Sequence, residues 1–162
     1  MTVRIVLADN QHVYRQSLVF TFVREPGFLM MGEVAAEVDL YAIAAQTTPD
    51  VVFIGAHLAR ASTVAAMNGL AEVRPEAKVI CHTDSMKWQV VRDAARASAS
   101  GLVSQAATTH ELIEAALTAA RSTHRYFCRL ALEGIANALF EREAGLPHKA
   151  VLTAREQELL GR

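Results

Sequence analysis

The chain has 162 residues, of which 52% are hydrophobic and 20% are charged, and its formal net charge is -1. This length and composition allow one well-buried domain plus a short appendage, so folding needs no disulfide or metal. Basic residues are scattered along the chain. Because nucleic-acid binding normally uses a basic patch that neutralises several phosphates, we expect these residues alone to bind DNA poorly.

The location of the protein is indicated by its cysteines and apolar runs. Cys81 and Cys128 have no metal-ligand spacing, and one possible pair is no disulfide framework. No apolar run approaches the roughly 18 residues that span a bilayer, and the N-terminus does not resemble a signal peptide. We therefore expect a reduced, cytoplasmic protein with no membrane partner.

Apolar runs alternate with helical patterns along the chain, which is typical of an α/β fold with a parallel sheet covered on both faces. We expect five strands, over residues 3–8, 28–34, 51–54, 78–82 and 101–103. Between them, apolar residues recur at helical spacing. Four helices are expected, one that ends near Pro26 and others at about 38–46, 62–73 and 86–97.

The fifth helix has the clearest start signal, because Thr108 stands three residues before Glu111 in a capping-box arrangement. This helix completes a (βα)5 unit. A sixth helix is predicted after residue 128, where Leu132, Ile135, Ala136 and Leu139 recur at helical spacing. This stripe is a dimer seam or the face with which the helix packs on its own domain, and the sequence leaves both open.

Polar residues follow the predicted strands at what should be one edge of the sheet. Asp9 and Asn10 end the first strand, and they either start the next helix or keep a ligand pocket. Gly55 ends the third strand, where we expect a turn with positive φ or a close backbone approach. Thr83 follows the fourth strand, and we expect it to cap the loop before the next helix.

Histidines also lie near the predicted strand ends. The spacing of His12, His57 and His82 matches no known metal-ligand pattern. Cys81 is expected to be a small core side chain, and its neighbour His82 should point to the opposite face of the sheet, so the two form no catalytic pair.

Several strings, in the right order, resemble the receiver domain of bacterial response regulators of the NarL/FixJ branch, which carries a LuxR-type helix-turn-helix. They match the family's first strand with its acidic pair, its third and fourth strands, the turn into its fifth strand, its linker and the first helix of its DNA-binding domain. These strings are residues 5–10, 49–54, 79–83, 97–101, 125–127 and 152–160.

The resemblance implies a flavodoxin-like (CheY-like) (βα)5 doubly wound parallel sheet with an extra C-terminal linker helix. It implies a receiver-like domain over residues 1–121, a linker with a helix over 122–150 and the truncated start of a helix-turn-helix over 151–162. We expect the full protein to continue beyond Arg162 and to bind DNA only through the helix-turn-helix that lies there.

The departures from the family pattern concern phosphorylation. Gly55 stands where the family has the aspartate that accepts a phosphoryl group, and Gln105 stands at the lysine that pairs with it. Asp9 keeps an acid of the family's first loop, Asn10 has lost a charge but remains a polar ligand, and Thr83 keeps the hydroxyl that contacts the phosphate in the family. Without a carboxylate at position 55 there is no nucleophile and no central Mg²⁺ ligand. We expect a vestigial pocket with no catalytic or phosphorylated residue, no cofactor and weak or absent Mg²⁺ binding.

The resemblance also points to a function. It implies a phosphorylation-independent (pseudo-)receiver module of a two-component, LuxR-type transcription regulator, which is not an enzyme and acts as a homodimer or through a regulatory protein or small ligand. The expected dimer or partner face comprises Trp88, Arg92, Arg96, Glu111, Glu114 and Arg121.

The alternative is a flavodoxin-like small-molecule-binding domain or minor enzyme that uses a vacated pocket near Gly55. The first loop argues against a bound cofactor phosphate, because it lacks the glycines that would let the backbone wrap one.

Overall fold

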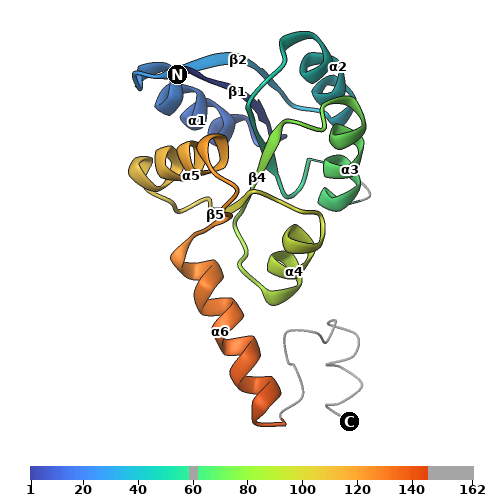
Figure 1. Cartoon of the computed structure of the whole chain (residues 1–162), viewed down its shortest axis with the longest axis vertical. Coiled ribbons are helices and arrows are strands. Elements are labelled where there is room, and N and C mark those ends of the chain that lie inside the picture. The colour runs from blue at the N-terminus through green and yellow to red at the C-terminus, as the bar shows by residue number, and fades with distance from the viewer. Residues whose placement is uncertain (59–61, 146–162) are drawn as a thin grey trace.

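The computed structural model describes residues 1–58 and 62–145 of the chain (Figure 1). Helices and strands alternate from the N-terminus: β1 (Val3–Ala8), α1 (His12–Arg24), β2 (Phe28–Val34), α2 (Glu37–Thr47), β3 (Val51–Gly55), α3 (Thr63–Val73), β4 (Lys78–Thr83), α4 (Trp88–Arg96), β5 (Gly101–Ser104), α5 (Thr109–Arg121), β6 (Tyr126–Phe127) and α6 (Arg129–Glu143).

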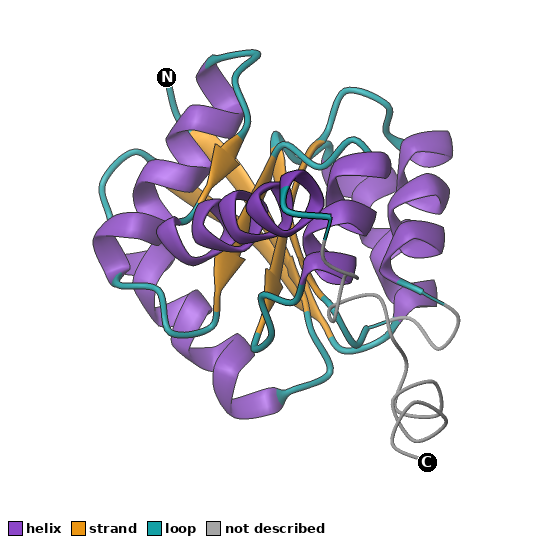
Figure 2. Ribbon diagram, turned by 90° about the horizontal axis from the view of Figure 1, so that it is seen from below, coloured by secondary structure: helices purple, strands orange, loops and turns teal. Residues whose placement is uncertain are grey.

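The strands form one parallel sheet in the order β2-β1-β3-β4-β5-β6, with helices on both of its faces (Figure 2). Because successive strand residues point to opposite faces, β1 supplies two cores. Ile5 and Leu7 pack with α1 and α5, whereas Val6 and Ala8 pack with α2, α3 and α4. The doubly wound α/β fold expected from the sequence is confirmed.

All five predicted strands are present, and β3, β4 and β5 each extend one residue beyond the expected end. The predicted capping box is also present, since the Thr108 hydroxyl accepts from the Glu111 amide and the Glu111 carboxylate accepts from the Thr108 amide. At the start of α3, the Ser62 hydroxyl accepts a hydrogen bond from the Ala65 amide. Side-chain caps therefore set where two of the helices begin.

The expectation of five strands was wrong by one, because Tyr126 and Phe127 form a sixth strand beside β5. Two residues are too short to show the alternation by which strands are recognised in a sequence. The pairing depends on Gly101, since a Cβ at that position would lie 3.1 Å from the Tyr126 carbonyl oxygen. β6 thereby occupies the edge of β5 that a five-stranded sheet would leave open.

Helix α6 contacts its own domain with a face that overlaps the predicted apolar stripe only at Ile135. It packs against α4 and β5, and it buries Ala131 and Ala138, with Ile135 partly buried against the core. Leu132 and Leu139 are 54% and 55% exposed. Figure 1 shows α6 extending away from the body of the domain. Two alanines and Ile135 thus make the intramolecular contact, and both leucines of the stripe are left on the surface.

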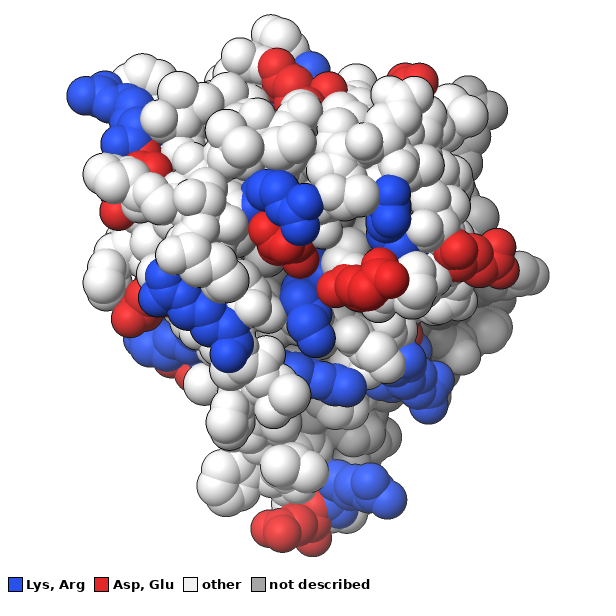
Figure 3. Space-filling model, turned by 45° about the horizontal axis from the view of Figure 1, so that its top comes forward, with Lys and Arg blue, Asp and Glu red and all other residues white. Residues whose placement is uncertain are grey.

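The predicted helix-turn-helix start at 151–162 lies outside the described residues. Within the described ranges, no helix combines the length and the apolar character needed to cross a bilayer. Basic and acidic side chains are interspersed on the face shown in Figure 3, and neither sign dominates it.

Candidate functional site

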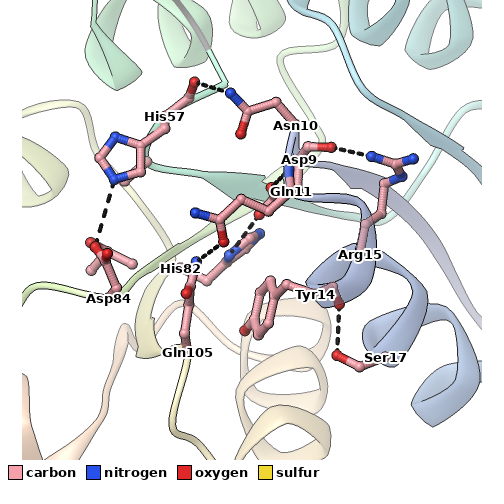
Figure 4. Close-up of polar contacts among 12 residues, drawn as sticks. Asp9, Asn10, Gln11, Tyr14, Arg15, Ser17, His57, His82, Asp84 and Gln105 are labelled. Carbon is pink, nitrogen blue, oxygen red and sulfur yellow. Dashed lines mark hydrogen bonds and ion pairs between the residues drawn. The ribbon is translucent and has the colours of Figure 1, made fainter.

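The carboxyl ends of β1, β3, β4 and β5 bring the predicted pocket residues together at one edge of the sheet. Asp9 and Asn10 follow β1, Gly55 ends β3, and Gln105 follows β5. In the sheet register, Gly55 lies directly opposite His82 of β4. This is the edge at which open parallel sheets bind ligands, and the juxtaposition expected from the sequence is present in the structure (Figure 4).

The space beside Gly55 is filled. A Cβ built at this position would lie 2.5 Å from Asp9 Oδ2, 2.9 Å from Asp9 Cγ and 3.1 Å from His82 Cε1. Gly55 does not have a positive φ. The close approach expected at this glycine is therefore made by two side chains rather than by backbone.

Asp9 and His82 are shielded from solvent, with 2% and 0% of their surfaces exposed. His82 Nδ1 lies 3.4 Å from Asp9 Oδ2. Burial lowers the pKa of His82 to about 3, so the imidazole is neutral at physiological pH and the contact joins a neutral ring to a carboxyl group. Burial raises the pKa of Asp9, and the hydrogen bond from the Gln11 amide to Asp9 Oδ1, 2.5 Å long, opposes that rise.

A third polar group, the Tyr14 side chain of α1, completes the buried cluster. Its ring centroid lies 4.9 Å from that of His82. Burial, with a smaller contribution from Asp9, raises the pKa of the Tyr14 phenol. The Tyr14 hydroxyl and both ring nitrogens of His82 are buried and lack a hydrogen-bond partner among the described residues. Burying such atoms without a partner costs free energy, so this cluster opposes the stability of the fold.

The remaining polar side chains of this edge are engaged with other parts of the protein (Figure 4). The Asn10 amide donates to the His57 carbonyl over 2.9 Å. Gln105 donates to the Gln11 side-chain oxygen over 2.9 Å, which joins the loop after β5 to the loop after β1.

Thr83 is engaged with its own loop. Its hydroxyl accepts from the Ser85 amide and contacts the Ser85 carbonyl, as expected for a residue that caps this loop. None of these side chains is directed at a common ligand.

The donor set does not suit Mg²⁺. This ion prefers several oxygen ligands in near-octahedral order, often from more than one carboxylate. Among the described residues, Asp9 is the carboxylate buried beside Gly55, and the amides of Asn10 and Gln105 are already in use. Among the described residues, no three His, Cys, Asp or Glu side chains are placed to hold a metal ion.

The sequence reasoning missed the role of His82 and Tyr14. The strand alternation that separated His82 from Cys81 correctly placed the two on opposite faces, and Cys81 is a buried core thiol whose pKa burial raises to about 12. That same alternation places His82 on the side of the sheet where Gly55 would carry a side chain. The signal was therefore available, but it required the register between β3 and β4.

The expected partner face lies on α4 and α5, and the strand between these helices is covered. β6 pairs with β5, and α6 packs against both α4 and β5. Arg92 contacts its neighbour Asp93, and Glu114 lies 3.5 Å from His110 on the same helix. The structure thus places Trp88, Arg92 and Arg96 on one helix and Glu111, Glu114 and Arg121 on another, with added structure between the helices.

Comparison with known proteins supports the resemblance. No family model matches the sequence. Over 119 residues, the chain is 29% identical to an uncharacterised transcriptional regulatory protein, YxjL of Bacillus subtilis, a match that covers 74% of this chain and 55% of that protein. The chain therefore spans about half the length of this curated relative.

Solved structures of receiver domains have the same fold. A LuxR-family two-component response regulator from Aurantimonas sp. SI85-9A1 superposes with a TM-score of 0.80 at 24% identity, covering 87% of this chain and all of the other. The isolated receiver domain of RcsB from Salmonella enterica serovar Typhimurium, in the presence of phosphomimetic BeF3-, has a TM-score of 0.74 at 11% identity and covers 82% of this chain and 98% of that one. This chain has the receiver fold of LuxR-family response regulators and is related in sequence to a transcriptional regulatory protein.

Proposed function

We propose that this chain is a receiver module of a LuxR-type transcription regulator whose output does not depend on phosphorylation. One observation carries the proposal: the position of the phosphoryl acceptor is a glycine, and Asp9 and His82 occupy the space that an acceptor side chain would need. The site lacks the nucleophile, and a side chain at position 55 would require Asp9 to shift.

The chemistry of the neighbouring groups supports the same conclusion. An acyl phosphate needs a carboxylate nucleophile, and the carboxyl group that remains, Asp9, is buried against His82. Gln105 can donate a hydrogen bond but cannot supply the positive charge that a phosphoryl group demands. We therefore assign the site no catalytic role and expect Mg²⁺ to bind weakly or not at all.

Output would come from assembly and from DNA binding by the full-length protein. In this proposal, residues 1–121 form the receiver-like domain, 122–150 the linker, and 151–162 the start of the helix-turn-helix. The protein would act in the cytoplasm and bind DNA as a homodimer, since paired helix-turn-helix domains match the two half-sites of an operator.

The exposed leucines of α6 favour a second copy of the chain as the partner. Leu132 and Leu139 stand seven residues apart, which places them on one side of the helix, and Phe140 beside them is 70% exposed. Large apolar side chains grouped on a helix that projects from its domain indicate an interaction surface. Because β6 and α6 cover β5, we propose that α6 contributes to pairing together with the expected residues of α4 and α5.

The proposal is tested by titration with beryllofluoride and Mg²⁺, followed through the fluorescence of Trp88, the single tryptophan, which lies in α4. We expect no saturable change at millimolar Mg²⁺, whereas a receiver that keeps its acceptor aspartate should respond in the same assay. A saturable response, or recovery of the intact protein with a labile phosphoryl group on an acidic side chain of this edge, would refute phosphorylation independence.

A further inference from the structure

A cavity of about 170 Å³ lies on the opposite side of the sheet from Asp9 and His82. α3 and α4 form its walls, and the ends of β4 and β5 form its floor. Met67, Cys81, Ala94 and Leu102 line the interior. Thr83, at the end of β4, also lines this cavity, whereas Asp9 and His82 lie on the other face of the sheet.

The size of the cavity suits one small ring. In general, a dry apolar cavity of about 150 Å³ is able to bind benzene. The interior is apolar, as Met67, Cys81 and Leu102 are all buried members of the same core cluster. The volume is too small for a nucleotide or a flavin, which fill sites of about 300–1,000 Å³.

Two sulfur atoms favour an aromatic ring over an aliphatic one. Met67 Sδ and Cys81 Sγ lie 3.7 Å apart, and both residues line the cavity. Divalent sulfur makes favourable contacts with the edges of aromatic rings. Because burial raises the pKa of the Cys81 thiol to about 12, the sulfur is a neutral thiol and offers a ring a soft contact rather than a charge.

The rim sets the charge of the ligand. Asp84 and Asp93 line the opening, and no Lys or Arg of the described residues does. Asp84 lies 3.6 Å from the His57 imidazole, and Asp93 lies 3.3 Å from the Arg92 guanidinium. Both pairs are partly exposed to solvent, so these contacts leave carboxylate oxygens able to accept from a ligand. The remaining acceptor capacity favours a cation or a hydrogen-bond donor and disfavours an anion such as phosphate.

From these observations we propose that the cavity binds a small aromatic amine, with its ring among Met67, Cys81 and Leu102 and its ammonium group at Asp84 and Asp93. The inference deepens the proposed function, because it names a ligand class that could control a receiver without phosphate. The regulatory role of the ligand rests on the proposed function, whereas the binding itself does not. A ring held between α3 and α4 would favour whichever position of α4 closes the cavity.

The test uses phenethylamine as the probe, measured by calorimetric titration and by the shift in melting temperature. We expect saturable binding in the millimolar range or tighter for a ligand of this size. Phenylacetate has a similar shape and the opposite charge, and ethylamine keeps the charge without the ring, so neither should bind measurably. Equal binding of phenylacetate, or no binding of phenethylamine, would overturn the proposal.

Variants separate the two parts of the site. Asp84→Asn combined with Asp93→Asn should weaken phenethylamine binding by at least about tenfold. Asp39→Asn, which removes an exposed acid from α2, should leave it unchanged. Leu102→Phe should fill the cavity with the chain's own ring and abolish binding, and Ala94→Leu should do the same from the α4 side. Retained binding in both folded filling variants would contradict the assignment.

The outcome is independent of the phosphate test. If the protein responds to beryllofluoride and also binds the amine, phosphorylation independence is wrong and the cavity site is supported. If the protein responds neither to beryllofluoride nor to phenethylamine, the proposed function is retained and aromatic amines are excluded as ligands of the cavity.

Discussion

Asp9 and His82 meet beside Gly55, with 3.4 Å between the carboxyl Oδ2 and the imidazole Nδ1 and almost no access to solvent. Asp9 follows β1 and His82 lies in β4, and because these strands flank β3 the two side chains close over the end of that strand. Restoring the family's phosphorylation site would therefore require more than one substitution.

Gly55→Asp should destabilise the protein and should not restore phosphorylation. The new Cβ alone would overlap with Asp9, and the added carboxylate would lie beside a second one, so we expect a loss of about 1–3 kcal/mol in the free energy of unfolding. Urea denaturation measures this loss. Ala35→Asp, at an exposed loop position, is the matched control for an added charge and should change stability little.

A double-mutant cycle tests whether crowding against His82 causes the loss of stability in Gly55→Asp. If crowding is responsible, Gly55→Asp should cost less in a His82→Ala background than in the wild type, because the smaller side chain leaves room. Wild-type stability of Gly55→Asp, or a normal beryllofluoride response in it, would show that the site is not filled.

The buried imidazole predicts a loss of stability in acid. The pKa of His82 in the folded protein, about 3, lies below the ordinary value of 6.5, so below about pH 6.5 the unfolded chain binds a proton that the folded chain does not. The free energy of unfolding is therefore unaffected by His82 above about pH 6.5. It falls as the pH drops from there toward 3, with a slope approaching about 1.4 kcal/mol per pH unit. The raised pKa of Asp9 acts in the opposite sense at the acid end.

Denaturant titrations at about pH 7 and about pH 4.5 test this dependence. His82→Leu should reduce the difference in stability between the two pH values, since the titrating group is gone. His124→Gln changes a histidine on an exposed loop and should leave the difference as it is. An unchanged pH dependence in His82→Leu would show that the acid sensitivity has another source.

Two neighbouring residues of α6 separate folding from association. Ala138 is 5% exposed and Leu139 is 55% exposed. Ala138→Glu would bury a charge and should lower the free energy of unfolding by at least about 2 kcal/mol. Leu139→Glu should change it by less than about 0.5 kcal/mol while reducing self-association.

The association of these variants is measured by light scattering coupled to gel filtration, over a range of concentrations. Val38→Glu, on the exposed surface of α2, is the control for an added surface charge and should leave association unchanged. If the double variant Leu132→Glu with Leu139→Glu associates as strongly as the wild type, α6 is not part of the pairing surface.

The capping box at the start of α5 should contribute measurably to stability. Thr108→Ala removes the hydroxyl that accepts from the Glu111 amide over 3.2 Å, and a loss of about 1 kcal/mol is expected. Thr109→Ala, one residue further on and exposed, keeps the box intact and should cost little. Thermal or urea unfolding of the pair measures the difference, and equal stability of the two variants would argue against the cap.

Much of the fold could be predicted from the sequence because its signals are local. The alternation of apolar runs with helical patterns predicted the five longer strands, and the Thr108 to Glu111 spacing predicted the start of α5. β6 was missed because it has only two residues and therefore shows no alternation of its own. It forms only by pairing with β5, which lies more than twenty positions earlier in the chain.

The sequence by itself determined that position 55 has no side chain, because a missing carboxylate can be read directly from the order of the residues. Only the tertiary structure decided what replaced it. Asp9 and His82 lie 73 positions apart by number, and their meeting depends on the order of β1, β3 and β4 in the sheet. The same holds for α6, where packing selected Ala131 and Ala138 as the inner face although leucines mark the apolar stripe, because helices approach a domain closely where their side chains are small.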